Sequence, residues 1–235
     1  MSNFLKSLLF VRKCVVCHGA LPDADDDAVF CENCFARYQV LCSNECPLCE
    51  KEEWACNCVP DRLKGKVGFA AHLFRFRDDI SRTLVYSMKL RNLPFLQRFF
   101  ANEIADMIRK RAGDDLSDYT LTYAPRKPKS VRVYGFDQSK TVASLAADRL
   151  GIPFATVFRH THFSKLQKRL NARKRKLNAR KSYYLNEAYV RKTDKLLIVD
   201  DVMTTGSTLS SLITLARMAG FTEVSVVCIA RTGRI

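Results

Sequence analysis

Hydrophobic and polar positions follow two regular periods in the part of the chain after residue 60. Apolar residues at helical spacing predict four amphipathic helices. The first contains Ile80, Leu84 and Met88, and the second starts near Pro94 in "LPFLQRFFANEIADMIRKR". The other two have apolar stripes closed by a glycine: Val142, Leu145, Ala146 and Leu150 before Gly151, and Leu209, Leu212, Leu215 and Ala216 before Gly220.

Four apolar segments between these helices have the length of β-strands. They are "VGFAAHLFRF" (67–76), which predicts a strand or a hairpin, "YTLTYAP" (119–125), "KLLIVDD" (195–201) and "EVSVVCIA" (223–230). The continuous apolar run of the third is typical of a strand buried on both faces of a parallel sheet. Strands that alternate with helices predict a doubly wound α/β domain over residues 61–235, with a boundary near residues 59–66.

Composition adds that the chain is folded and basic. Its 235 residues, 47% of them hydrophobic, are enough to bury a substantial core. Lys and Arg outnumber Asp and Glu by 39 to 24, and the net charge of +15 favours phosphate-bearing or other anionic partners. The N-terminal "NFLKSLLFV" is interrupted by Lys6 and is too short for a membrane span or a signal peptide. We therefore expect a cytoplasmic protein without stable membrane insertion.

Nine of the ten cysteines lie between residues 14 and 58, which predicts a metal-binding segment over residues 1–60. The first candidate site consists of two Cys-x2-Cys pairs, Cys14 with Cys17 and Cys31 with Cys34. Four such thiolates close a tetrahedron around zinc and leave no position open for water, so the zinc would be structural. In a reducing compartment zinc is favoured over disulfides, while thiol redox chemistry and a cysteine-rich contact surface are the alternatives.

A second zinc site is predicted from the remaining cysteines of this segment. Its ligands would be Cys46, Cys49, Cys56 and Cys58. The last two are separated by a single residue, and Cys42 stands close enough in sequence to replace one of the four. The segment is therefore predicted to be a double zinc ribbon. The tenth cysteine, Cys228, lies in an apolar run and is predicted to be a buried, inert thiol.

The stretch "LLIVDDVMTTGSTL" (196–209) joins an apolar strand to two aspartates and a turn rich in hydroxyl groups. Ligands of open α/β sheets bind beyond the carboxyl ends of the strands, where Asp200 and Asp201 are expected. The N–H groups and hydroxyls of "TTGST" (204–208) would form an anion cradle at the start of a helix, with Gly206 allowing close backbone approach. Carboxylates beside such a cradle predict a site for a ribose 5-phosphate. Simple helix capping is the alternative, but capping needs only one such residue.

Residues 159–181 contain ten Lys or Arg and no Asp or Glu, with aromatic residues at the borders. The run is predicted to be a solvated loop, a groove for single-stranded nucleic acid, or a lid that closes on pyrophosphate. The candidate nucleic-acid contacts are Lys168, Arg169, Arg173, Lys174, Arg175 and Lys176.

"LLIVDDVMTTGST" resembles the phosphoribosyl pyrophosphate (PRPP) motif of class I phosphoribosyltransferases. Together with the cysteine-rich N-terminus, the chain is similar over nearly its whole length to the ComF family of competence-associated proteins. Three further stretches carry this resemblance: "MKLRN" with Lys89, "YAPRKPKSVRVYGFDQS" with Arg132, Gly135, Phe136 and Gln138, and "QKRLNARKRKLNARKSY" with Gln167, Leu170, Arg175, Asn178 and Tyr183. The chain departs from the family's usual "RGFNQ" at Tyr134 and Asp137, and from its second zinc site at Cys56-x-Cys58.

The resemblance implies a fold, a ligand and roles for individual residues. The fold would be a class I phosphoribosyltransferase-like parallel sheet with helices on both faces, plus a small N-terminal zinc ribbon. Asp200 and Asp201 would be the catalytic and ribose-binding residues, and magnesium would bridge pyrophosphate and ribose oxygens. The remaining PRPP-binding residues would be Thr204, Thr205, Gly206, Ser207 and Thr208 at the 5-phosphate, with Arg126 and Lys127 at the pyrophosphate and Lys89 beside them.

Two classes of function are compatible with these residues. In the first, the protein binds PRPP with magnesium and supports the uptake or handling of single-stranded DNA, with DNA-uptake proteins as partners. In the second, it is an active phosphoribosyltransferase that moves phosphoribose onto a nitrogenous acceptor in nucleotide metabolism.

Overall fold

The computed structural model describes residues 11–21, 27–47, 49–52, 54–161 and 182–232. Its centre is a four-stranded sheet in the order β3-β8-β7-β4, in which neighbouring strands are parallel. The strands span Ala70–Arg75 (β3), Tyr119–Tyr123 (β4), Lys195–Met203 (β7) and Glu223–Arg231 (β8). All four predicted strands therefore form, and "VGFAAHLFRF" is one strand of this sheet.

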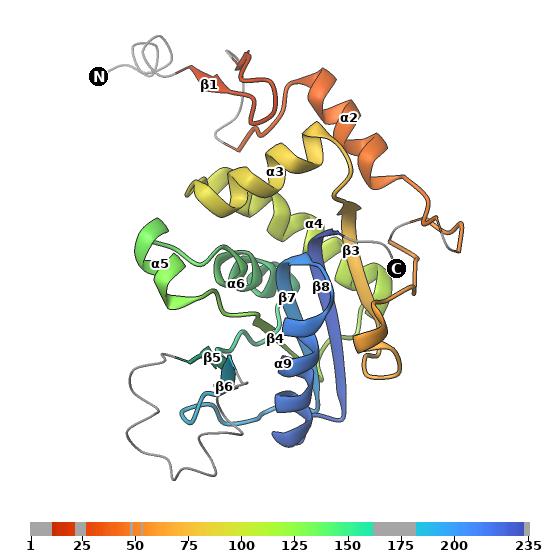
Figure 1. Ribbon diagram of the computed structural model, residues 1–235, viewed down its shortest axis with the longest axis vertical. Coiled ribbons are helices and arrows are strands. Elements are labelled where there is room, and N and C mark those ends of the chain that lie inside the picture. The colour runs from red at the N-terminus through yellow and green to blue at the C-terminus, as the bar shows by residue number, and fades with distance from the viewer. Residues whose placement is uncertain (1–10, 22–26, 48, 53, 162–181, 233–235) are drawn as a thin grey trace.

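Helices cover both faces of the sheet, as predicted (Figure 1). Helices α3 (Asp79–Leu90), α4 (Pro94–Ala112) and α6 (Gln138–Leu150) pack on one face, and α9 (Ser207–Met218) packs on the other. Successive side chains of β7 point to opposite faces of the sheet, so they alternate between the two hydrophobic cores. Leu197 and Val199 join the core under α4 and α6, whereas Leu196 and Ile198 join the core under α9.

Local sequence signals fix the ends of these helices. Asp78 caps α3 by accepting the N–H of Ser81 at 2.9 Å, and α4 begins with Pro94 at its first position. Asp137 caps α6 in the same way, and Gly151 ends that helix in the left-handed conformation at φ 69°.

The structure contains further elements that the periodicity did not predict. They are the hairpin β1 (Arg12–Lys13) with β2 (Ala20–Leu21), the helix α2 (Glu32–Cys42), the 3-10 turn η1 (Asp61–Leu63), the helix α5 (Pro128–Tyr134), and the hairpin β5 (Phe158–His160) with β6 (Tyr183–Leu185). The short strands β5 and β6 flank residues 162–181.

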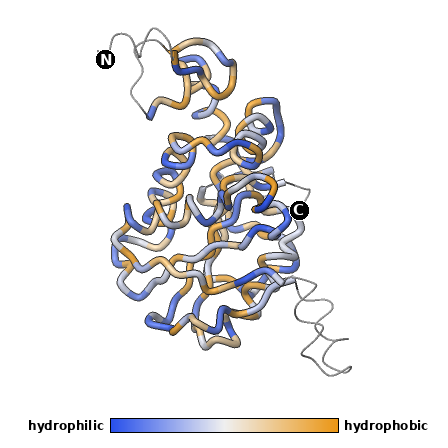
Figure 2. The backbone as a smooth tube through the Cα atoms, turned by 90° about the vertical axis from the view of Figure 1, so that its left-hand side faces the viewer, coloured by the Kyte–Doolittle hydropathy of each residue, from blue (hydrophilic) through white to orange (hydrophobic). Residues whose placement is uncertain are grey.

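The N-terminal segment packs against the helices on the α4 side of the sheet and extends the molecule at one end (Figure 2). Tyr38 of α2 lies in the same hydrophobic core as Phe74 and Phe99, with ring centroids 6.2 and 5.2 Å away. Its hydroxyl donates to Glu103 Oε2 at 2.8 Å. The two parts of the chain thus share a core, and the boundary near residues 59–66 stays a prediction. Within the described residues, no helix combines the length and apolarity needed to cross a membrane.

Candidate functional site

Asp200 and Asp201 lie close to the carboxyl end of β7, three and two residues before that strand ends at Met203. Their position inside the strand, and not after it, follows from β8, which continues to pair with β7 as far as Met203. Desolvation raises the pKa of Asp200 well above its ordinary value, and the neighbouring charge of Asp201 adds to the effect. Two adjacent, poorly solvated carboxyl groups repel each other when both are ionised, so a cation or hydroxyl donor placed here would stabilise them.

Asp201 is held by residues from two helices on the same face of the sheet. Gln138, at the start of α6, donates from Nε2 to Asp201 Oδ2 at 2.6 Å. Lys89, in the last turn of α3, places Nζ 3.6 Å from the same oxygen. The Asp201 side chain is only 16% exposed, so this ion pair is screened less by water than a surface pair would be. The structure therefore brings together two predicted site residues, Lys89 and Asp201.

Arg126 ties the loop after β4 to this group. Its backbone N–H donates to Asp137 Oδ2 at 2.9 Å, and its guanidinium donates to Gln138 Oε1 and to the Lys89 carbonyl oxygen, both at 2.9 Å. Gln138 thus contacts both Arg126 and Asp201. Lys127 is the exposed residue directly before α5, and within the described residues its side chain forms no hydrogen bond or ion pair with this group.

The turn at residues 204–208 leads from β7 into α9. Gly206 has φ 70° and ψ 9°, a left-handed conformation that favours glycine, and α9 begins at the next residue. No side chain caps the first turn of α9, so helix capping does not explain the hydroxyls of this turn. Thr204, Thr205 and Ser207 are exposed, which leaves their hydroxyls and the helix N–H groups accessible to an anion.

Tyr183 of β6 is a site residue to which the sequence assigned no role. Burial raises the pKa of its hydroxyl, the side chain of Thr208 opposes that shift, and the charges of Asp200, Asp137 and Asp201 add to it. The hydroxyl therefore lies near both the aspartates and the turn. The six candidate nucleic-acid contacts, Lys168, Arg169, Arg173, Lys174, Arg175 and Lys176, lie outside the described residues.

Both predicted cysteine sets form compact groups whose Sγ atoms lie within 4.8 Å of one another. The groups are Cys14, Cys17, Cys31 and Cys34, and Cys46, Cys49, Cys56 and Cys58. The Sγ atoms of Cys17 and Cys31 are 3.7 Å apart, close to the roughly 3.8 Å edge of a tetrahedron with zinc–sulfur bonds of about 2.3 Å. Each group could hold one zinc ion.

Cys42 belongs to neither group among the described residues. Burial raises the pKa of its thiol to about 12, although a hydrogen bond with Tyr38 opposes that shift. The position of its sulfur, outside both compact groups, therefore assigns Cys42 no place among the candidate zinc ligands. The single residue between Cys56 and Cys58 does not prevent the second group from closing, because Cys46 and Cys49 complete it from the other side.

The second cysteine group is joined to the carboxyl ends of two strands by buried arginines. Arg75, at the end of β3, donates to Cys46 Sγ at 3.1 Å. Arg231, its registered partner on β8, donates to the carbonyl oxygen of Cys58. These contacts place a guanidinium charge next to the second cysteine group, where it would offset the negative charge of metal-bound thiolates.

Comparisons with known proteins give one curated relative and several solved structures. No family model matches the chain. The chain is similar to competence protein ComFC of Streptococcus pneumoniae, with 21% identity over 212 residues that cover 88% of this chain and 90% of that protein.

Two of the similar solved structures are enzymes. One is the allosteric regulatory enzyme of purine biosynthesis (TM-score 0.43, 18% identity, 61% of this chain and 30% of that one). The other is a purine phosphoribosyltransferase from Pyrococcus horikoshii (TM-score 0.35, 16% identity, 60% of this chain and 78% of that one). The chain spans less than a third of the length of the first.

The similarity to ComFC is too long to be confined to the aspartate motif or to the sheet domain. An alignment over 212 of 235 residues includes part of the cysteine-rich segment as well as the sheet. The same two parts form the cysteine groups and the parallel sheet of the structure. The similarity to competence protein ComFC thus spans both parts of the chain, the cysteine-rich N-terminal segment and the parallel sheet with helices on both faces.

Proposed function

We propose that the protein binds PRPP with magnesium at Asp200, Asp201 and the turn at residues 204–208. The observation that carries the proposal is the position of two poorly solvated carboxyl groups on β7, directly before an uncapped helix N-terminus. Ribose hydroxyls would donate to the carboxylates, while the 5-phosphate would accept N–H groups at the start of α9. A ligand with ribose hydroxyls and a 5-phosphate would therefore pair with both the carboxylates and the N–H groups at the start of α9.

The pyrophosphate would lie near Lys89 and Arg126, with Lys127 reaching it from the start of α5. Lys89 and Arg126 already meet at Gln138 and Asp201, so their positive charges converge on one side of the acid pair. Magnesium prefers hard oxygen ligands and would be held by the aspartates together with ligand oxygens, neutralising charge on the pyrophosphate.

Thermal unfolding with PRPP and magnesium tests this assignment. At a ligand concentration a hundred times the dissociation constant, binding to the folded state alone stabilises by about 2.7 kcal/mol, or roughly 5–10 °C for a chain of this size. The double variant Asp200→Asn with Asp201→Asn should stay folded and lose this shift. Asp148→Asn, which changes an exposed acid on α6, should keep it. An equal shift in wild type and double variant would refute the assignment.

We also propose that the protein is a member of the ComF family and handles single-stranded DNA during uptake. Two observations support this: the relative is named as a competence protein, and residues 159–181 carry ten positive charges without an acid. Single-strand affinity should fall steeply with salt, because bound phosphates release counterions. Replacing Lys174, Arg175 and Lys176 by glutamine should weaken binding and flatten that salt dependence. If affinity and slope both stay unchanged, residues 174–176 have no part in DNA binding.

Phosphoribosyl transfer is a second candidate function. It is favoured by the cations Lys89 and Arg126 beside Asp201, because they are positioned to stabilise a pyrophosphate leaving group. Pyrophosphate release from PRPP in the presence of nitrogenous acceptors would support transfer. PRPP binding without release over the same acceptors would support the binding role instead.

Zinc is the metal proposed for both cysteine groups. The support is the donor set: four sulfurs in each group, at separations suited to a tetrahedron. Elemental analysis of unchelated protein should find two zinc ions per chain.

A further inference from the structure

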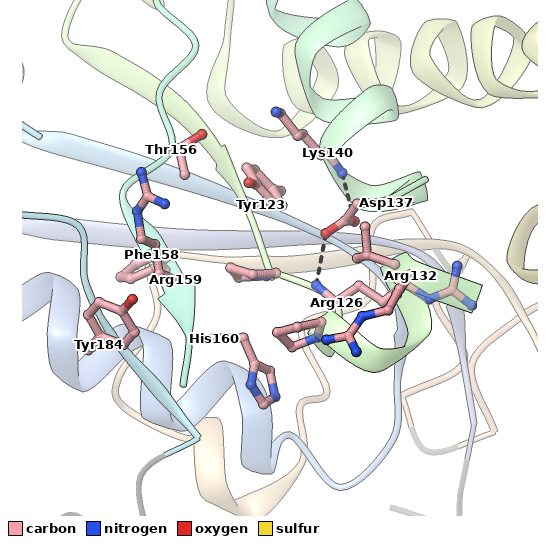
Figure 3. Close-up of a pocket in the computed structure, with 13 residues that line it drawn as sticks. Tyr123, Arg126, Arg132, Asp137, Lys140, Thr156, Phe158, Arg159, His160 and Tyr184 are labelled. Carbon is pink, nitrogen blue, oxygen red and sulfur yellow. Dashed lines mark hydrogen bonds between the residues drawn. The ribbon is translucent and has the colours of Figure 1, made fainter. Parts of the chain in front are cut away.

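A cavity of about 620 Å³ lies beside the aspartate site (Figure 3). It is bounded by the loop after β4, by α5, by the start of α6 and by the β5–β6 hairpin. Its volume falls within the range of about 300–1,000 Å³ that is usual for small-molecule sites. Among the proposed PRPP contacts, Arg126 lines this cavity, whereas Lys89, the aspartate pair and the turn at residues 204–208 do not. The other lining residues of the cavity have no part in the proposed PRPP contacts.

One part of the cavity lining is apolar. Tyr123 of β4 and Phe158 of β5 are buried side chains that reach it from two strands. Pro125, Pro128 and Val131 continue the apolar lining towards α5. An apolar lining with aromatic and proline rings favours a planar, weakly polar group.

The rim of the cavity is strongly cationic. Figure 3 shows Arg159 and Tyr184 on one side and Arg126 and Arg132 on the opposite side. Arg159 is held in place because its Nε donates to Asn186 Oδ1 at 2.9 Å, which leaves its terminal N–H groups available. Within the described residues, no acid pairs with the side chain of Arg132.

Asp137 is the acid that lines the cavity, and its carboxylate is already occupied. It accepts the backbone N–H groups of Arg126 at 2.9 Å and Lys140 at 3.2 Å. Burial raises its pKa, and those two hydrogen bonds only partly oppose the shift. One carboxyl group that is turned towards backbone donors cannot offset the charges of Arg132, Lys140 and Arg159, so the cavity attracts anions.

We infer that this cavity binds a nucleotide, with the base on the apolar lining and the phosphate among the rim cations. The apolar lining lies beside Arg132, Lys140 and Arg159, which form no ion pair with an acid among the described residues. This combination matches a ligand that has one planar and one phosphorylated part. The hydroxyls of Thr156 and Tyr184 line the same space and could hydrogen-bond the base or sugar. The ligand is either a free mononucleotide or one nucleotide of a single strand, since both present the same chemistry.

Calorimetric titration of the full chain with adenosine 5′-monophosphate tests the inference. Wild type should bind this nucleotide saturably, and adenosine without phosphate should bind much more weakly. The double variant Lys140→Gln with Arg159→Gln should reduce the affinity roughly tenfold or more, because it removes two phosphate partners. The matched control Arg82→Gln with Lys192→Gln removes two exposed cations elsewhere and should change the affinity less than twofold.

The same proteins distinguish this cavity from the proposed PRPP site. The cavity variant should keep the thermal shift with PRPP and magnesium, because neither residue belongs to that site. Absence of saturable nucleotide binding in wild type, or equal losses in cavity and control variants, would overturn the inference. So would a nucleotide affinity that disappears with Asp200→Asn and Asp201→Asn. A short oligothymidylate that displaces the mononucleotide would identify the single strand as a source of the ligand, whereas no displacement would identify the free nucleotide.

Discussion

Gly206 lies where the proposed phosphate turn meets the linker from the cysteine-rich segment, and its replacement by alanine tests the packing there. The backbone at Gly206 is left-handed, at φ 70°. A Cβ atom added to it would lie 3.0 Å from Leu63 Cγ and 3.4 Å from Pro60 Cβ. Leu63 is completely buried, so its side chain cannot move aside into solvent.

Two costs add up in Gly206→Ala. The left-handed conformation costs a residue with a Cβ about 1–2 kcal/mol, and overpacking against Leu63 costs about 1–3 kcal/mol. Alanine also restricts the unfolded chain, which returns about 0.4–1 kcal/mol. We expect the free energy of unfolding to fall by about 1.5–4 kcal/mol.

Urea denaturation of this variant beside Gly151→Ala measures the packing cost separately. Gly151 has nearly the same backbone conformation, at φ 69°, but an added Cβ there would meet nothing within 4 Å. Gly151→Ala should therefore lose only the conformational part, about 0.5–1.5 kcal/mol. If Gly206→Ala costs no more than Gly151→Ala, the linker does not constrain the turn and the reasoning is wrong.

Three further predictions concern the buried charges. Arg75→Met removes the donor to Cys46 and should destabilise the fold by about 3 kcal/mol or more. A chelator that leaves the wild-type protein intact should remove one zinc ion per chain from this variant. Elemental analysis that still finds two zinc ions after chelation would contradict this. Asp200 has a raised pKa in the folded state, so its ionisation costs stability as pH rises from about 4 through that higher value. Without ligand, Asp200→Asn should therefore unfold at a higher temperature than wild type at pH 7, with a smaller advantage at pH 4, and a less stable variant at pH 7 would refute the assignment. Tyr38→Phe removes the hydrogen-bond donor to Glu103, whose pKa is already raised by burial. The free energy of unfolding in urea should fall by about 1.5–3 kcal/mol at pH 8 and by less at pH 5. A fall that is the same at both pH values would argue against this pair.

The main sheet and its covering helices were predictable because their signals are local. A strand buried on both faces shows a continuous apolar run, and β7 has one from Leu196 to Val199. Helix α2 was missed although Cys34, Tyr38 and Leu41 are its buried residues and recur at helical spacing. Helix α5 has no buried residue, so no apolar stripe could indicate it.

The site was predictable only where its residues are neighbours in sequence or belong to a recognised motif. The aspartates and the turn at Gly206 follow one another, so the sequence shows them together. The contact of Gln138 with Asp201 depends on where α6 begins relative to the end of β7, which no local pattern states. Tyr183 lies near enough to the aspartates for their charges to raise its pKa. Its position depends on the pairing of β6 with β5, and those strands are too short to show a period.

The carboxyl edge of the sheet explains why the cysteine-rich segment and the aspartate site occur in one molecule. Arg75 and Arg231 end β3 and β8 at this edge, and both are buried. A buried guanidinium needs a partner of opposite charge or strong acceptors, and the second cysteine group supplies a sulfur and a carbonyl oxygen. The chain then continues through Pro60 and Leu63 to the back of Gly206. Folding of the second cysteine group would therefore fix the ends of two strands and one side of the turn at residues 204–208. If this group holds zinc as proposed, removal of the metal should loosen the proposed PRPP site as well as the N-terminal segment.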